Sequence, residues 1–275
     1  MPEVQAHAER LAAALEGAVL EGVDVLNFAA LKTFDPPIDT AVGTPLQGVG
    51  RRGKFLLLDF GAVTHVVHLM QGGRLRPDPK ATRKPRGGMI RWRFGDVGSW
   101  LLTEAGTERK AGVWVVSGDP RTQAPLDGLG PEADEVDREA LGAICRANSM
   151  RLHGLLREQH AIAGIGRMLA NEICYEAALS PFANAAKLTD PELDRLHEAI
   201  GRVMSSALEH ERTLDDIGRS ADRPSKVHNR GGQPCLDCDD AIRTVEYRSY
   251  TVAYCPTRQT GGKVLADNTT SKFLR

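Results

Sequence analysis

The hydrophobic pattern of the chain changes in character along its length. Residues 3–16 place Val4, Leu11 and Leu15 on one face of a helix, and Gly17 would end it. Short apolar runs separated by glycine and proline follow, at residues 54–60, 63–69, 89–94, 100–103 and 113–116. No helical pattern lies between these runs, so they predict an antiparallel β-sandwich or barrel and not a parallel sheet.

Helical patterns dominate the second half of the chain. They cover residues 138–147, 150–159, 167–177 and 190–208. In the third helix Leu169 and Ile173 are four residues apart, and in the fourth Asp190 is the expected N-cap with Pro191 in the first position. The fold class expected is α+β, with strands first and helices second.

Composition indicates where the domains divide. Residues 119–137 are polar, acidic and rich in glycine and proline, as expected of a linker. We therefore predict a β-sandwich domain flanked by helices, a helical domain, a loop with a cysteine hairpin, and a tail. Their expected ranges are 1–118, 138–212, 213–260 and 261–275.

Length and composition are those of an ordinary globular protein. The 275 residues are 41% hydrophobic and 26% charged, enough for two domains with full cores. No apolar run approaches the roughly 20 residues of a membrane span, and no signal peptide is visible. Three of the five cysteines lie between residues 235 and 255, which argues against a disulfide framework and favours the cytosol. Cys145 and Cys174 are expected in the core.

The distribution of charge is more informative than its sum. A net charge of −1 does not indicate a nucleic-acid binder. Residues 74–93, however, hold eight basic side chains against the single acid Asp78, while acids concentrate in residues 127–139. The basic stretch is either a solvated face or a surface for a polyanion.

The cysteine spacing near the end of the chain is that of a zinc ribbon. Cys235 and Cys238 form one pair, and Cys255 begins a second pair whose last position is Arg258. Residues 241–254 between the pairs are rich in β-branched and aromatic side chains, as in a β-hairpin.

The fourth position leaves two alternatives open, because the guanidinium of Arg258 keeps its proton and cannot ligate zinc. Zinc could be held by the three cysteines with water or another side chain, for which His228 is a conceivable candidate. The hairpin could equally be free of metal.

Two shorter features suggest chemistry. Gly164 and Gly166 lie in a turn that opens a helix, where backbone N–H groups and Arg167 could bind an anion such as phosphate. If Met1 is removed, Pro2 becomes a secondary amine at a helix start, where the helix dipole disfavours its protonated form. Such an amine attacks aldehyde-like carbons, and Glu3 could move the proton. A proline that merely begins a helix is the plain alternative.

Several short motifs occur together in one order and resemble a known family. They are Pro2-Glu3, Arg52-Gly53-Lys54, His68-Leu69, Leu129-Gly130-Pro131-Glu132, Ile162-Ala163-Gly164-Ile165-Gly166, Asn171-Glu172-Ile173, Pro234-Cys235 and Tyr254-Cys255-Pro256. From residue 2 to about residue 260 the chain resembles the formamidopyrimidine-DNA glycosylase/endonuclease VIII family of base-excision repair enzymes.

The resemblance implies a fold, an activity and roles for residues. The fold would be a β-sandwich joined to a helix–two-turn–helix domain with a zinc or zincless hairpin, and the protein a monomer acting on lesion-containing double-stranded DNA. Pro2 would attack C1′ of a flipped nucleotide, Glu3 would assist, and Lys54 would contact a flanking phosphate. The enzyme would be a DNA glycosylase and AP lyase acting on damaged bases or abasic sites. Further phosphate contacts would come from residues Arg52, Gly164, Gly166, Arg167 and Arg258.

The chain also departs from the family pattern. Family members commonly begin Pro-Glu-x-Pro-Glu-Val, whereas Pro2 here leads straight into the helix. Of the residues that fill the gap left by a flipped base, Arg109 is present, Gln71 beside Met70 stands where methionine is usual, and Ala111 replaces an aromatic residue. These departures keep one alternative open, a non-catalytic binder of damaged or abasic DNA on the same scaffold. A further alternative outside this family is a general zinc-ribbon module for nucleic acid, which the series of motifs disfavours.

Overall fold

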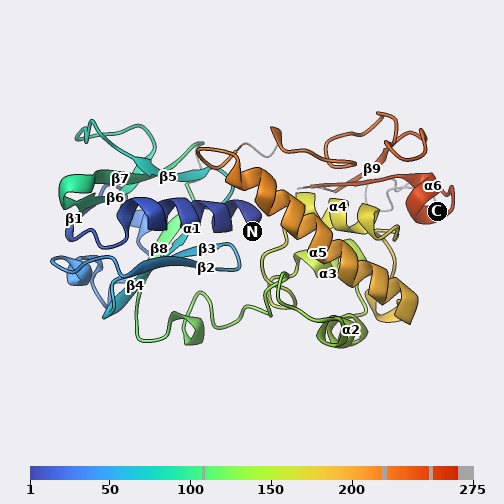
Figure 1. Cartoon of the computed structure of the whole chain (residues 1–275), viewed down its shortest axis with the longest axis horizontal. Helices are drawn as coiled ribbons and strands as arrows, with labels where there is room; N and C mark the ends of the chain where they lie inside the picture. The colour runs from blue at the N-terminus through green and yellow to red at the C-terminus, as the bar shows by residue number, and fades with distance from the viewer. Residues whose placement is uncertain (107–108, 219–221, 248–249, 266–275) are drawn as a thin grey trace. The chain divides into compact units, whose positions relative to one another are not determined.

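The computed structural model describes residues 1–106, 109–218, 222–247 and 250–265. The chain divides into two compact units (Figure 1). The β unit comprises Glu3–Gly128 and Asp215–Ile217, and the helical unit comprises Met1–Pro2, Leu129–Leu214 and Gly218–Arg275. The structure thus leaves the predicted linker, residues 119–137, partly in each unit.

The β unit is a sandwich of two antiparallel four-stranded sheets beside the helix α1, Pro2–Leu15. One sheet has the order β1-β6-β7-β5, formed by Leu20–Val25, Gly88–Phe94, Gly98–Glu104 and Gly73–Pro77. The other has the order β2-β3-β4-β8, formed by Gly48–Arg52, Phe55–Asp59, Val63–His68 and Gly112–Ser117. Short 3-10 helices lie at Phe28–Ala30 and Ile38–Ala41 between β1 and β2, at Gly95–Val97 between β6 and β7, and at Pro120–Thr122 after β8. The predicted antiparallel sandwich is confirmed.

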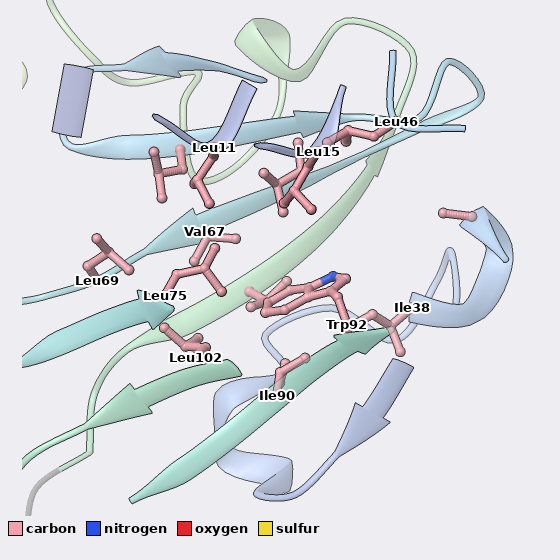
Figure 2. Packing of buried hydrophobic residues seen from close by; sticks show 14 of the residues in the cluster. Leu11, Leu15, Ile38, Leu46, Val67, Leu69, Leu75, Ile90, Trp92 and Leu102 are labelled. Carbon is pink, nitrogen blue, oxygen red and sulfur yellow. The ribbon is translucent and has the colours of Figure 1, made fainter. Parts of the chain in front are cut away.

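A single apolar core holds the two sheets and α1 together. Trp92 extends from β6 toward Val67 of the other sheet, and Leu15 of α1 closes the cluster (Figure 2). All three side chains are at most 1% exposed. The Trp92 indole donates a 3.0 Å hydrogen bond to Nδ1 of His65, and burial lowers the pKa of His65 to about 3. The histidine is therefore a neutral acceptor that satisfies the buried indole N–H.

Three strands of the sandwich were not predicted from the sequence. In β2 the only large apolar residue is Val49, in β5 it is Leu75, and β1 is interrupted by Gly22. β1, β2 and β5 lie at sheet edges, where each pairs along one side only. Backbone hydrogen bonds from a more apolar neighbouring strand hold these edge strands in place. They therefore need few apolar residues of their own, and their hydrophobic pattern is weak.

The helical unit contains the four helices that the periodicity predicts. They are α2 Arg138–Ala147, α3 Leu152–Arg157, α4 Arg167–Glu176 and α5 Asp190–Arg212, with a 3-10 turn at Ala185–Lys187. Leu169, Ile173, Cys145 and Cys174 are buried in its core as expected. The predicted N-cap of α5 is wrong by one residue.

Thr189, and not Asp190, caps α5. The backbone N–H and the hydroxyl of Thr189 each donate a 2.8 Å hydrogen bond to the Glu192 carboxylate. This capping box of Thr189 and Glu192 determines where the helix begins, and it leaves Asp190 inside the first turn.

The expected cysteine hairpin is present. It consists of β9 Arg243–Glu246 and β10 Thr251–Tyr254, which pair antiparallel, followed by the short helix α6 Pro256–Thr260. Most of the predicted tail, from residue 266 onward, lies outside the described residues, as do positions 219–221 of the predicted loop. Within the described ranges, no helix is both long enough and apolar enough to cross a membrane.

Candidate active site and cysteine cluster

The N-terminus is packed and not free in solvent. Pro2 is the first residue of α1, with Glu3 in the first helical turn. Met1 is only 3% exposed and belongs to the apolar cluster of the helical unit. A Cβ added to Gly164 would lie 2.7 Å from the Met1 sulfur, so this turn accommodates Met1 only because residue 164 is glycine. Pro2 itself is buried, and its nitrogen becomes an amine only when Met1 is removed.

The turn between β2 and β3 carries two of the expected phosphate-binding side chains. Arg52 pairs with Phe55 in the ladder, and Gly53 makes the turn with a φ of 56°. Lys54 is half-buried beside His68. Burial and then the Lys54 charge lower the pKa of His68 to about 4, so this histidine is neutral at physiological pH. The positive charge of this end of the sheet therefore comes from Arg52 and Lys54, together with Arg51 of β2.

Two loops of the sandwich carry the residues expected to fill the gap of a flipped base. Met70 is 43% exposed with a φ of 54°, and Gln71 is exposed beside it. Arg109 is exposed with a φ of 40°. Ala111 is fully buried, and its backbone N–H donates a 2.6 Å hydrogen bond to the Glu104 carboxylate. Position 111 therefore supports the loop and offers no side chain to a ligand.

The glycine turn before α4 is braced from within the helical unit. The Gln159 side chain accepts a 3.0 Å hydrogen bond from the Gly164 N–H and donates one of 3.0 Å to the Ile165 carbonyl. Gly166 is the N-cap of α4 and contributes no side-chain cap. The half-buried Arg167 begins the helix. A helix start without a side-chain cap is a site where backbone N–H groups can bind an anion.

A buried carboxylate in α4 organises the segment that leads to the cysteines. Glu172 is 8% exposed, and its oxygens accept hydrogen bonds from the backbone N–H groups of Lys226, Val227 and His228 at 2.7, 3.1 and 2.8 Å. The neighbouring Asn171 contacts Nδ1 of His228 at 2.9 Å.

These contacts correct one expectation from the sequence. His228 was a candidate for the fourth zinc ligand, but it is held by Asn171 and is not in the group of gathered ligand atoms. The structure does not place His228 with the three cysteine sulfurs, because Asn171 of α4 holds its ring nitrogen.

The three hairpin cysteines do come together. The sulfur atoms of Cys235, Cys238 and Cys255 lie within 4.8 Å of one another, and the Tyr175 hydroxyl lies 3.1 Å from the Cys235 sulfur. Burial raises the pKa of Cys235, but hydrogen bonds, first from Tyr175, outweigh it and lower that pKa to about 7, whereas burial raises the pKa of Cys255 to about 12. A metal ion displaces the protons of the thiols that it binds, so the three gathered sulfur atoms fit a zinc ion with three protein ligands.

Arg258 holds the hairpin to α4. Its Nε donates a 3.0 Å hydrogen bond to the Tyr175 carbonyl, and its Nη1 lies 2.6 Å from the Asp237 carboxylate. The guanidinium also lies over the Tyr175 ring, 4.7 Å from the centroid. A direct phosphate contact by Arg258 stays a prediction, since several of its contacts are within the protein.

Comparison with known proteins identifies the family of this chain. Residues 1–110 match the formamidopyrimidine-DNA glycosylase N-terminal domain, and residues 128–217 match the formamidopyrimidine-DNA glycosylase H2TH domain. The formamidopyrimidine-DNA glycosylase of Thiobacillus denitrificans is 31% identical over 269 residues, which cover 94% of this chain and 98% of that protein. The chain belongs to the formamidopyrimidine-DNA glycosylase family. The resemblance drawn from the sequence motifs is confirmed.

Other family members extend the comparison. An uncharacterized formamidopyrimidine-DNA glycosylase-like protein of Mycobacterium tuberculosis is 37% identical over 162 residues, 58% of this chain and all of that protein. The structure of MutM (Fpg) from Thermus thermophilus has a TM-score of 0.82 at 25% identity, covering 96% of this chain and 99% of that one. Lactococcus lactis Fpg bound to DNA with an AP site has the same fold, with a TM-score of 0.83 at 20% identity, covering 94% and 99%.

In this member of the glycosylase family, the structural roles of three residues were not predicted from the sequence. Gln159 braces the glycine turn, and Asn171 and Glu172 anchor residues 226–228. Asn171 and Glu172 belong to a family motif visible in the sequence, but no spacing reveals a partner more than 50 residues away. A charged residue on the buried face of α4 was the one available signal.

Proposed function

We propose that this chain is a base-excision DNA glycosylase with AP-lyase activity, acting on damaged bases or abasic sites in duplex DNA. The observation that carries the proposal is that both family domains match in order along the chain, with Pro2 and Glu3 at the start of α1. The Lactococcus lactis Fpg, similar in fold, is described in a complex with DNA containing an AP site, and a mutant of it in a complex with DNA containing Fapy-dG.

The proposed reaction begins at Pro2 after removal of Met1. The secondary amine attacks C1′ of the flipped nucleotide, the bond from C1′ to the base breaks, and the base leaves with a proton. The C1′–O4′ bond of the sugar then breaks as O4′ takes up a proton, and the open-chain iminium that forms acidifies C2′. Loss of a C2′ proton then breaks the C3′–O bond and nicks the strand, and water releases the sugar fragment. In this proposal Glu3, the next residue in the first turn of α1, donates and accepts the protons of these steps.

The remaining predicted site residues bind DNA in this proposal. Arg52 and Lys54 at the β2–β3 turn, and the α4 start from Gly164 through Gly166 to Arg167, would bind backbone phosphates. The exposed Met70, Gln71 and Arg109 would fill the gap of the flipped nucleotide. Because Ala111 is buried, position 111 adds no aromatic side chain to the residues that fill this gap.

Zinc has a structural role in the proposal. Cys235, Cys238 and Cys255 would hold the ion and tie the two ends of the hairpin together. A site with three thiolates binds zinc more weakly than one with four, because each lost ligand removes free energy that is coupled to folding.

Replacing Arg258 with cysteine tests this assignment. We expect Arg258→Cys to bind zinc about tenfold or more tightly, because it supplies the missing fourth thiolate. The zinc-free variant should melt at a lower temperature than the zinc-free wild type, because the contacts of Arg258 with Asp237 and Tyr175 are lost. Chelator competition and thermal melting with and without zinc measure both effects. An unchanged zinc affinity in Arg258→Cys would mean that position 258 cannot reach the metal.

The proposed activity is tested by borohydride trapping on a duplex with a single abasic site. A covalent protein–DNA band together with strand nicking is the expected result, because borohydride reduces an iminium to a stable amine. The buried Pro2 and the short start of α1 favour a second candidate, a non-catalytic damage binder. Tight binding without any trapped band would support that candidate and refute the proposed AP-lyase step through Pro2.

A further inference from the structure

The free end of the cysteine hairpin packs as a stack of aromatic rings. The backbone N–H of Tyr247 donates a 2.9 Å hydrogen bond to the Tyr250 carbonyl, which brings these residues together beyond β9 and β10. Their rings are stacked with centroids 4.7 Å apart and an interplanar angle of 11°. Tyr250 also lies nearly parallel to His153 of α3, 6.0 Å away. The hairpin end is thereby docked on α3.

Two arginines at α3 attach to these rings. The guanidinium carbon of Arg157 lies 4.0 Å from the centroid of Tyr250. Arg151 donates a 2.6 Å hydrogen bond from Nη1 to the Tyr247 hydroxyl, and its guanidinium lies 5.6 Å from the Phe182 ring centroid. Neither arginine pairs with a carboxylate anywhere in the described ranges of the chain.

Other arginines of the helical unit, by contrast, pair with carboxylates. Arg138 bonds two aspartates of α5, Arg202 bonds Glu176 and Glu198, and Arg258 bonds Asp237. An aromatic ring, unlike a carboxylate, restrains a guanidinium without cancelling its charge. It covers the flat face of the group and leaves the N–H donors at the edge available.

The ring stack adds no negative charge beneath the arginines. His153 is 3% exposed, and its Nε2 is buried without a hydrogen-bond partner among the described residues. Burial, and then the charge of Arg157, lower the pKa of His153 to about 3, which keeps the ring neutral. The positive charge of Arg151 and Arg157 is therefore uncompensated at this place.

We propose that Arg151 and Arg157, restrained by Tyr247 and Tyr250, form a phosphate-binding surface for the backbone of duplex DNA. This proposal rests on the proposed function. It assigns part of the protein's sequence-independent affinity for DNA to these two arginines. A flat ring partner such as a base is less suited to this place, because Tyr250 already contacts Tyr247, His153 and Arg157. A phosphate oxygen instead meets preoriented N–H donors.

Salt-dependent binding tests the surface. Arg151→Gln and Arg157→Gln are each expected to weaken binding to an undamaged duplex about tenfold. Each should also reduce the slope of log K against log salt concentration by about 0.9, the value for one phosphate contact. Arg138→Gln is the matched control, because it removes the same formal charge from a guanidinium already neutralised by Asp190 and Asp194. The control should retain the wild-type slope.

Two further variants separate phosphate binding from a purely structural role. Arg157→Lys keeps the charge and should retain most of the salt slope, whereas Tyr250→Leu should weaken binding because Arg157 loses its restraint. Tyr250→Phe keeps the ring and should bind as the wild type does. If Arg157→Gln lowers only the melting temperature and leaves the salt slope unchanged, the surface is structural and the proposal fails.

The outcomes also distinguish this proposal from the proposed function. Suppose that the wild-type protein binds and nicks damaged DNA, and that both glutamine variants keep the wild-type salt slope. That result overturns the proposed phosphate-binding surface and leaves the proposed function standing. Wild-type protein that binds no duplex DNA overturns the proposed function and the surface together. A stronger effect of the variants on duplex RNA than on duplex DNA would overturn the assignment to DNA.

Discussion

Pro2→Leu is expected to abolish the covalent adduct that borohydride traps on an abasic duplex. Leucine has a primary amine in place of the proline ring, and a bulky second residue also prevents the usual removal of Met1. Met1 would then remain buried against Gly164 and keep residue 2 covered. Loss of the proline amine at the start of α1 should reduce trapping below detection, a decrease of at least about 10³-fold for a step that depends on nucleophilic catalysis.

The measurement combines trapping with the intact mass of each protein, which reports whether Met1 is present. Glu3→Gln is the matched control, because it alters the proton-transfer group but keeps the nucleophile. It should still be trapped, with slower strand nicking. Binding of Pro2→Leu to the abasic duplex should stay near that of the wild type. A full-strength adduct in Pro2→Leu would assign the nucleophile to another amine.

Glu172→Ala is expected to destabilise the helical unit by about 3–5 kcal/mol. The carboxylate accepts three backbone hydrogen bonds from residues 226–228, and its removal leaves those N–H groups without an acceptor. Because this segment leads into Cys235, zinc affinity should fall as well. Denaturant unfolding followed by far-UV circular dichroism, and zinc competition, measure the two effects.

Glu176→Ala provides the control for this prediction. It lies one turn further along α4 and pairs with Arg202 and Lys226 near the surface. Solvent screens such pairs, so its loss should cost about 1 kcal/mol or less. Equal effects of the two substitutions would show that Glu172 contributes only a surface-like ion pair, contrary to its burial.

Some helices and strands were predicted from the sequence and others were not, for a physical reason. α1, α4 and α5 repeat apolar residues with the helical period, and they form where that period predicts. β2 and β5 have too few apolar residues to be visible, because hydrogen bonds from β3 and β7 hold them in place. The start of α5 also shifted, because the capping box of Thr189 and Glu192 competes with a cap at Asp190.

The sequence by itself determined the family, the α+β class and the cysteine spacing, because these depend on residue types at short separations. Only the tertiary structure decided what surrounds each site residue. It buried Met1 in the apolar cluster of the helical unit, held His228 on α4 away from the cysteines, and turned Arg258 toward Tyr175 and Asp237. Arg258 and Tyr175 are 83 positions apart, and Met1 and Gly164 are farther apart still. No local pattern encodes such contacts, because packing and hydrogen bonding select the partners only when the chain is folded.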